Sequence, residues 1–232
     1  MLSRIFEIVA DVFFPARCLV CRAPGAWWCA ACRASVECLS RNRCPGCGKS
    51  LFEHSCEQDI LRGLAVTGFY HDKRLREAIQ ALKYHGVTKI MPQIEAYLKA
   101  WRDVRLDPWP WAGESSLVVQ HLPAAPRHVR KRGFDQARLI RDALIRSCLP
   151  WGKTGEILVR RGKARSQTEL SVELRRANVA GCFTLTRDAP IPPAILLVDD
   201  VFTSGATMRE AARALKAAGV ERIYGFALAL GS

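Results

Sequence analysis

Two adjacent acids followed by small hydroxyl residues form the stretch of this sequence best suited to chemistry. Asp199 and Asp200 follow an apolar run, Ile195 to Val198. A loop of small residues at the start of a helix presents free backbone N–H groups and the positive end of the helix dipole, which together suit a phosphate group. A simple acidic helix cap is the alternative, but a cap needs one acid and no such loop. The loop residues are Thr203, Ser204, Gly205, Ala206 and Thr207.

The elements around this stretch predict an open α/β sheet. The run Ile195 to Val198 is apolar without alternation, as in a strand buried on both faces of a parallel sheet. Residues 208–218 are rich in Ala and Leu, favour a helix and stop at Gly219. Asp199 and Asp200 would then lie at the carboxyl edge of the sheet, where such folds bind ligands. Neither a Walker loop nor a GxGxxG dinucleotide fingerprint occurs in the chain.

Cysteine spacing predicts a local zinc module. Eight of the ten cysteines lie between Cys18 and Cys56, so a disulfide scaffold along the whole chain is disfavoured and a reducing cytoplasm is expected. Two CxxC pairs facing each other complete a tetrahedral, structural zinc site, and buried or disulfide-linked cysteines are the alternative. The residues of this first site are Cys18, Cys21, Cys29 and Cys32.

A second cysteine pair follows, but its partner pair is incomplete. Cys44 and Cys47 form a CxxC, and Cys56 comes later in the sequence HSC. Either His54 or Cys38 could supply the fourth ligand, since imidazole and thiolate both bind zinc. A second ribbon without metal is the alternative, so the sequence predicts one or two zinc ions.

The net charge of +13 predicts an anionic partner. Residues 127–176 contain 14 basic and 5 acidic residues, a net +9. The basic run from His121 to Arg132 is interpreted either as a solvated loop or as a loop that meets an anion. Residues 161–181, polar between two expected strands, are a candidate lid. The expected anion or DNA contacts are Arg130, Lys131, Arg132, Arg161 and Arg165.

The chain divides near residue 60 into a cysteine-rich part, residues 1–60, and an α/β domain, residues 61–232. The first fourteen residues have apolar residues at helical spacing but are too short to cross a bilayer, and no signal-peptide cleavage site follows. Expected strands cover 64–70, 117–120, 157–160, 182–185 and 222–230, and expected helices cover 74–84 and 91–102. Residues 103–116 are expected to be a loop whose tryptophans either pack at its edge or stack on bases.

These motifs resemble known families. The apolar strand followed by Asp-Asp and Thr-Ser-Gly-Ala-Thr is similar to the binding motif of type I phosphoribosyltransferases. Nearly the whole chain resembles the ComF family, related to GntX, in which a cysteine-rich ribbon precedes such a domain. Besides the cysteines, the resemblance rests on LKYHG at 82–86, RKRGFDQA at 130–137, SQTELS with R..NV at 166–179, and VDDVFTSGAT. The chain departs from the family at Asp135, usually Asn, and at HSC, usually CxxC.

The resemblance implies a type I phosphoribosyltransferase-like fold that binds phosphoribosyl pyrophosphate, PRPP, with Mg²⁺. Asp199 and Asp200 would be the catalytic pair and hold the ribose hydroxyls, and Thr203 to Thr207 would cradle the 5′-phosphate. Residues 121–132 would meet the pyrophosphate. It also implies a role in competence, with transforming single-stranded DNA and the DNA-uptake machinery as partners in the cytoplasm. A metabolic phosphoribosyltransferase with an unknown nucleobase-like acceptor is the alternative, and no acceptor hood is recognisable.

Overall fold

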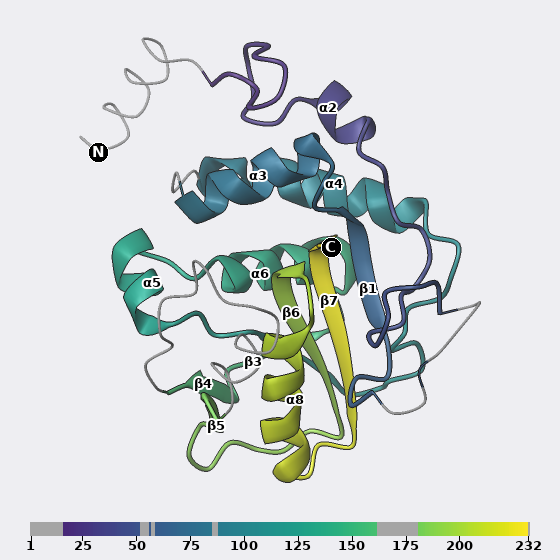
Figure 1. Ribbon diagram of the computed structural model, residues 1–232, viewed down its shortest axis with the longest axis vertical. Coiled ribbons are helices and arrows are strands. Elements are labelled where there is room, and N and C mark those ends of the chain that lie inside the picture. The colour runs from purple at the N-terminus through teal and green to yellow at the C-terminus, as the bar shows by residue number, and fades with distance from the viewer. Residues whose placement is uncertain (1–15, 52–55, 57–58, 85–87, 162–180, 232) are drawn as a thin grey trace.

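A five-stranded parallel sheet forms the centre of the computed structural model (Figure 1), which describes residues 16–51, 56, 59–84, 88–161 and 181–231. The strand order is β1-β7-β6-β2-β3, and every neighbouring pair is parallel. The expected mostly parallel α/β sheet is therefore confirmed. The strands are β1 (Leu64–Phe69), β2 (Leu117–His121), β3 (Lys153–Gly155), β6 (Ala194–Phe202) and β7 (Arg222–Leu230).

Helices cover both faces of this sheet because its central strands are apolar on both sides. Val198 and Phe226 pack into one core with α3 (Lys73–Tyr84), α4 (Met91–Asp103) and α6 (Gln136–Cys148). Ile195 and Leu197 belong to a second core, on the other face, under α8 (Ala206–Ala217). The alternation along β6 thus sends neighbouring side chains into different cores, which is the period-two geometry of a strand.

Smaller elements complete the described part of the chain. The helix α2 (Ala30–Ala34) lies in the cysteine-rich part, and the 3₁₀ turn η1 (Thr88–Ile90) precedes α4. The strands β4 (Leu158–Arg160) and β5 (Phe183–Leu185) form an antiparallel pair beside the main sheet. No helix among the described residues combines the length and the apolar character needed to span a membrane.

Most expected elements are found near their expected bounds. The structure differs from the expectation at two elements and adds a third. The strand β6 continues to Phe202, so Asp199 and Asp200 lie inside the strand and not after it. Part of the expected basic loop is a helix, α5 (Pro126–Arg132), which has Pro at its start and the left-handed Gly133 at its end. The edge strand β3 was not expected. The candidate lid, residues 161–181, lies almost wholly outside the described residues.

The tryptophans of the 103–116 loop are packed and do not form a base-stacking platform. Trp109 and Trp111 stack with ring centroids 5.2 Å apart, and Trp101 meets Trp109 edge to face. Trp111 is fully buried in the core on the α3–α4–α6 face. The guanidinium of Arg105 covers Trp109 at 4.2 Å from the ring centroid. The packed-edge interpretation is therefore the one that the structure bears out.

Candidate functional site

Asp200 is held by two partners that come from separate helices. It is only 5% exposed, because its place on β6 points it toward the core that contains α3 and α6. Its Oδ1 lies 2.9 Å from the Nζ of Lys83, and its Oδ2 accepts a hydrogen bond of 2.7 Å from the Nε2 of Gln136. A buried carboxylate needs such partners, since an unpaired buried charge is costly.

Lys83 is a site residue to which the sequence analysis gave no role. It stands in the last turn of α3, where a lysine ordinarily serves the helix dipole. Burial alone would lower the pKa of Lys83, but the carboxylate of Asp200, with Asp199 behind it, raises the pKa above its usual value. The ammonium is thus fixed in its charged form at the carboxyl edge. The sequence signal that could have identified Lys83 is the LKYHG motif at 82–86, which contains it.

Gln136 joins the site through the first turn of α6. Its Oε1 accepts a hydrogen bond from Arg132 at the end of α5, so α5, α6 and β6 are linked in series. Asp135 caps α6 by accepting from the N–H of Ala137, and its other oxygen accepts from the N–H of Ala124. Both carboxylate oxygens of Asp135 therefore accept from backbone N–H groups, a role that the single acceptor oxygen of an Asn side chain would fill only in part.

Asp199 faces the opposite side of β6 from Asp200 and is only half-buried. Its Oδ1 accepts a 2.8 Å hydrogen bond from the N–H of Asp200. Burial and the neighbouring charge of Asp200 raise the pKa of Asp199 to about 7. Unlike Asp200, it forms no ion pair with any described side chain. Asp199 is therefore the acid of the pair with acceptor capacity left for a ligand.

A buried histidine lies near the acids, at the end of the neighbouring strand β2. The Nδ1 of His121 is 3.1 Å from the guanidinium of Arg141, which can only donate, so Nε2 carries the proton. Nε2 lies 3.9 Å from Asp135. Burial lowers the pKa of His121 despite the carboxylates of Asp135 and Glu156. We therefore interpret His121 as a neutral imidazole that packs beside Asp135, the residue that accepts from the N–H of Ala124 in the loop after β2.

The phosphate-type loop lies between β6 and α8, as the sequence predicted. Gly205 has φ of 68°, in the left-handed region, and precedes the first residue of α8. A Cβ there would collide with the ring of Phe202 and the guanidinium of Arg209. The hydroxyl of Ser204 accepts from the N–H of Ala206 at 3.4 Å. The loop is therefore tightly turned, and the first N–H groups of α8 have no partners within the helix.

The predicted cations are spread over two neighbouring elements. Arg130 and Lys131 are exposed on α5, and Arg161 is exposed after β4. Arg132 is half-buried and touches Gln136 as well as the ring of Tyr84, 5.9 Å away. Of the predicted cations that the structure describes, only Arg132 contacts a partner of the acid pair, Gln136. Arg165 lies outside the described residues.

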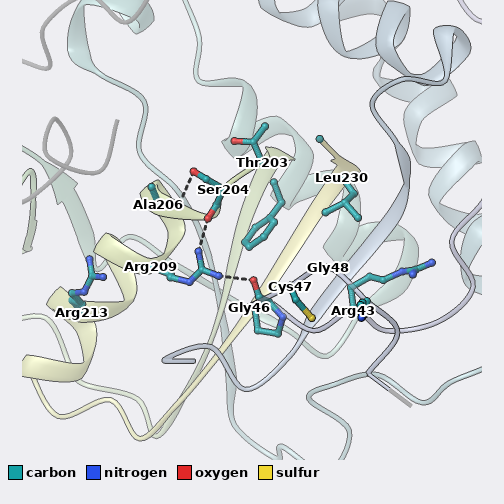
Figure 2. Close-up of a pocket in the computed structure, with 14 residues that line it drawn as sticks. Arg43, Gly46, Cys47, Gly48, Thr203, Ser204, Ala206, Arg209, Arg213 and Leu230 are labelled. Carbon is teal, nitrogen blue, oxygen red and sulfur yellow. Dashed lines mark hydrogen bonds between the residues drawn. The ribbon is translucent and has the colours of Figure 1, made fainter. Parts of the chain in front are cut away.

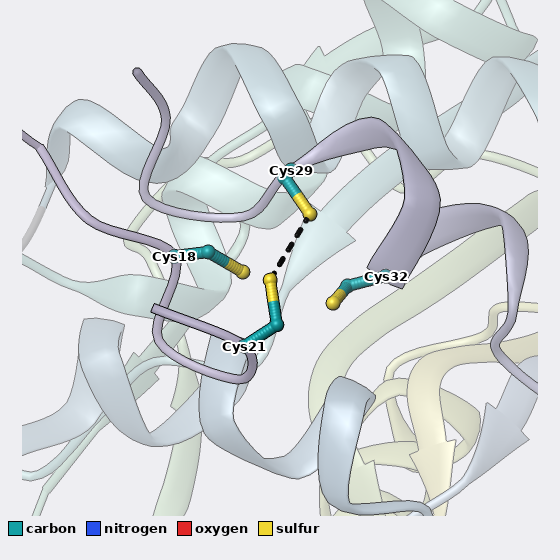
Figure 3. Close-up of side chains that lie close together, drawn as sticks. All are labelled: Cys18, Cys21, Cys29 and Cys32. Carbon is teal, nitrogen blue, oxygen red and sulfur yellow. Dashed lines mark hydrogen bonds between the residues drawn. The ribbon is translucent and has the colours of Figure 1, made fainter. Parts of the chain in front are cut away.

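The first cysteine cluster fits a zinc ion (Figure 3). The four sulfur atoms lie within 4.8 Å of one another, and Cys21 Sγ is 3.7 Å from Cys29 Sγ. Zinc–sulfur bonds of about 2.3 Å at tetrahedral angles place ligand sulfurs about 3.8 Å apart. All four cysteines are free of disulfides. The members are Cys18, Cys21, Cys29 and Cys32.

The second cluster contains three cysteines among the described residues, Cys44, Cys47 and Cys56. Its sulfurs also gather within 4.8 Å. Cys38 is not part of it, because its thiol contacts the hydroxyl of Tyr97 on α4 at 3.8 Å. Of the two candidates for a fourth ligand, Cys38 is thus ruled out. His54 lies outside the described residues and stays a prediction.

Comparisons with known proteins match the cysteine-rich part to a domain family and most of the chain to three relatives. Residues 9–61 match the double zinc ribbon domain family, which together with the two cysteine clusters supports zinc binding. The chain is 24% identical to Competence protein ComFC of Streptococcus pneumoniae over 220 residues, 90% of each chain. It is 24% identical to Competence protein ComFC of Bacillus subtilis over 211 residues, covering 86% of this chain and 82% of that protein. It is 28% identical to Competence protein F of Haemophilus influenzae over 233 residues, covering 94% and 98%.

Proposed function

We propose that this chain, whose resemblance to the ComF family these relatives confirm, binds PRPP at the carboxyl edge of its sheet and acts in natural competence. The proposal places it in the cytoplasm, where it would handle transforming single-stranded DNA together with proteins of the uptake machinery. The competence role rests on the names of three relatives that align with most of the chain. The PRPP site rests on the geometry of this chain. The division into residues 1–60 and 61–232 stays a prediction.

The observation that supports the PRPP site best is the convergence of three separate motifs on one buried acid. Lys83 from LKYHG and Gln136 from RKRGFDQA both contact Asp200 from the VDD motif. A helix cap would use one carboxylate and no half-buried lysine. Perturbed ionisable groups gathered at a ligand-binding edge are typical of functional sites, which favours a working pocket.

In this proposal the two acids have different tasks. Both oxygens of Asp200 are engaged, so this residue fixes the ammonium of Lys83 beside the site. Asp199 keeps acceptor capacity for a ribose hydroxyl. The cationic Lys83 and Arg132 would offset part of the ligand's negative charge. The Thr203–Thr207 loop would donate N–H groups to the 5′-phosphate.

Magnesium fits this donor set. Mg²⁺ usually binds through one or two carboxylates, several waters and the ligand's phosphates, and the half-buried Asp199 offers one such carboxylate. When bound, the ion would balance the charge of the pyrophosphate. Transfer of the phosphoribosyl group to an acceptor remains the alternative function. Its acceptor would be a nucleobase-like molecule.

Titration calorimetry with PRPP and Mg²⁺ tests the site. Asp200→Asn should lower the affinity at least tenfold, because it removes the charge that holds Lys83, and hydrogen bonds to charged groups contribute about 1.5–3 kcal/mol each. Asp188→Asn is the matched control, since Asp188 is exposed, lies in the loop before β6 and has a φ of 57° that Asn tolerates. Wild-type protein that does not bind millimolar PRPP would refute the site.

The role in DNA handling needs a separate test that leaves the acid pair intact. Arg130 and Lys131 are exposed, whereas Arg132 supports Gln136, so only the first two should be replaced by Ala. If each contacts a phosphate of single-stranded DNA, the slope of log affinity against log salt should flatten by roughly 0.7 per residue. PRPP affinity should not change. Wild type without affinity for single-stranded DNA at about 50 mM salt would instead favour the metabolic enzyme.

A further inference from the structure

A cleft of about 770 Å³ lies directly beside the phosphate-type loop (Figure 2). Thr203 and Ser204 form part of one side, together with the first turns of α8. The second cysteine knuckle, from Pro45 to Lys49, forms the facing side. The cleft is of the size that holds a whole small ligand, and one phosphate on the loop would fill only part of it.

The charged side chains that line this cleft are all cationic. Arg209 and Arg213 are already paired, with Asp59 and Glu210 respectively. Arg43 and Lys49 also line the cleft, and neither is paired with a carboxylate among the described residues. The guanidinium of Arg43 lies over the ring of Phe69, 5.9 Å from its centroid. The Nε atom of Arg43 is buried without a hydrogen-bond partner among the described atoms. The cleft therefore offers uncompensated positive charge next to the loop.

The acid pair lies outside this cleft. Asp199 and Lys83 are absent from its lining, although Asp199 is on the strand that leads into the loop. A ligand held by the loop would thus have two ends, a sugar end toward Asp199 and a second end in the cationic cleft. PRPP has the sugar end but no group that would occupy the cleft. Its 5′-phosphate is a terminal monoester, and nothing extends from it into the cleft.

A ligand that uses both ends must carry free sugar hydroxyls and continue beyond its 5′-phosphate. Inside a nucleic acid strand the 3′-oxygen is esterified, so an internal nucleotide would not offer its 3′-hydroxyl to Asp199. Only the nucleotide at the 3′ end combines a free 3′-hydroxyl with a phosphodiester on the 5′ side. The next nucleotide would bring its own phosphate into the cleft, where Arg43, Lys49 and Arg213 supply positive charge.

We propose that this site accepts the 3′ end of a single strand of nucleic acid. The terminal sugar lies toward Asp199, its 5′-phosphate on the loop, and the preceding nucleotide in the cleft between the loop and the second knuckle. The inference rests on the proposed PRPP site and extends it to a second ligand. The strand end would bind reversibly, as a free nucleotide does, so the proposal includes no covalent step.

The test compares thymidine 5′-monophosphate with the dinucleotide pTpT by titration calorimetry of the full chain. Wild type should bind pTpT at least tenfold more tightly than the mononucleotide. A pTpT blocked by a 3′-phosphate should lose that gain. The double variant Lys49→Ala, Arg213→Ala should bind pTpT about as weakly as the mononucleotide, while its PRPP affinity stays unchanged. Both side chains are exposed, so the variant should fold.

Lys153→Ala is the control, since Lys153 is an exposed lysine. It is the first residue of β3, at the edge of the sheet opposite to the carboxyl edge that holds the loop. It should bind pTpT as wild type does. The ribonucleotide counterpart pUpU distinguishes the source of the strand, because tighter binding than pTpT would indicate RNA. Equal affinities for pTpT and the mononucleotide, or indifference to the 3′-phosphate, would overturn the inference while PRPP binding stands. Failure of wild type to bind PRPP as well would overturn both proposals.

Discussion

The two cysteine knuckles share one backbone design but have different neighbours. In the first, the N–H of Arg22 donates to the carbonyl of Cys18 at 2.9 Å, and in the second the N–H of Gly48 donates to Cys44 at 2.8 Å. The donor residue is left-handed in both, with φ of 65° at Arg22 and 74° at Gly48. A turn of this kind places the paired thiols on one side, whatever lies beyond it.

Their surroundings differ. Trp28, next to the first cluster, is buried and its ring lies 5.1 Å from that of Tyr97 on α4. The first knuckle is thus attached to a helix layer, away from the phosphate-type loop. The second is linked to that loop through Arg209, which donates to the carbonyls of both Pro45 and Ser204. The first knuckle therefore packs against the helices, whereas the second knuckle lines the cleft beside the phosphate-type loop.

Removing one thiolate from each cysteine cluster is the change expected to have the largest effect. Structural zinc contributes about 10–16 kcal/mol in zinc-finger peptides, so Cys29→Ser should release zinc and unfold the first knuckle locally. Its PRPP affinity should stay near that of wild type. Cys47→Ser should lower PRPP affinity, because an unfolded second knuckle would no longer hold Arg209, which donates to the carbonyls of both Pro45 and Ser204 in the loop.

Metal analysis, intrinsic tryptophan fluorescence and calorimetry measure these outcomes. Cys38→Ser is the control, since Cys38 belongs to neither cluster. It should keep the zinc content of wild type. If Cys29→Ser and Cys47→Ser weakened PRPP binding equally, the distinction between the two knuckles would be wrong.

Arg209 gives the next largest effect because it links the second knuckle to the loop. Its guanidinium contacts Asp59, which is mostly buried, at 2.9 Å. Breaking a buried ion pair from one side usually costs about 3–5 kcal/mol. Arg209→Ala should therefore lower the free energy of unfolding in urea by about that amount and weaken PRPP binding.

The control for this change lies one turn further along α8. Arg213 also lines the cleft, but its side chain is 62% exposed and pairs with Glu210 on the surface. Arg213→Ala should change the stability by at most about 1 kcal/mol. Equal stability and equal PRPP affinity in the two variants would show that Arg209 does not link the knuckle to the loop.

The sequence predicted the elements whose pattern is local. The run Ile195 to Val198 and the segment 222–230 are apolar enough to be recognised as buried strands, and both belong to the sheet. The helix α5 carried its own signals, Pro126 at its first position and Gly133 after its end, but the basic run was interpreted as a loop. The strand β3 has the sequence Lys-Thr-Gly and exists because β2 pairs with it. Nothing local predicts such a strand.

The partners of the acid pair could not be predicted in the same way. Lys83 has the sequence context of an ordinary lysine at a helix C-terminus, and only the packing of α3 beside β6 brings it to Asp200. Gln136 meets the same carboxylate from 64 residues away. The sequence thus predicts the acids and the loop, whereas tertiary contacts decide which of the two acids is already occupied.

Gly205→Ala adds a single methyl group to the phosphate-type loop, to which the second knuckle is linked. The left-handed conformation costs a non-glycine residue about 1–2 kcal/mol, and the Cβ would also displace Phe202 or Arg209. The free energy of unfolding should fall by about 2–4 kcal/mol. PRPP affinity should fall as well, because the loop N–H groups would be reoriented.

Zinc content is the readout that keeps this prediction specific. The atoms nearest to a Cβ at Gly205 belong to Phe202 and Arg209, not to the first cysteine cluster, so the first zinc should be retained in full. Gly113→Ala is the matched control, since Gly113 is also left-handed, with φ of 90°, but a Cβ there would meet nothing within 4 Å. A Gly205→Ala protein that binds PRPP as tightly as Gly113→Ala does would contradict the role of the loop.

The smallest predicted effect is a pH dependence that belongs to Asp199. Burial and the adjacent Asp200 raise its pKa to about 7, whereas an aspartate in an unfolded chain has a pKa of about 3.9. Between these values the folded protein binds a proton that the unfolded chain has released. The contribution of Asp199 to the free energy of unfolding is therefore complete below pH about 4 and is lost as the pH rises to about 7.

Ligand affinity should change with pH in the opposite direction, because a ribose hydroxyl and Mg²⁺ both need the ionised carboxylate. From pH 6 to pH 8 the ionised fraction of a group with a pKa of about 7 rises about tenfold, so PRPP affinity should rise by at most about tenfold, or about 1.4 kcal/mol. The phosphates of PRPP titrate near pH 6 as well. The informative quantity is thus the difference between wild type and Asp199→Asn, whose side chain does not titrate. Calorimetry at three pH values should show a steeper rise for wild type, while the zinc content of both proteins stays the same. Parallel pH profiles would contradict the assignment of Asp199 as the acid that contacts the ligand.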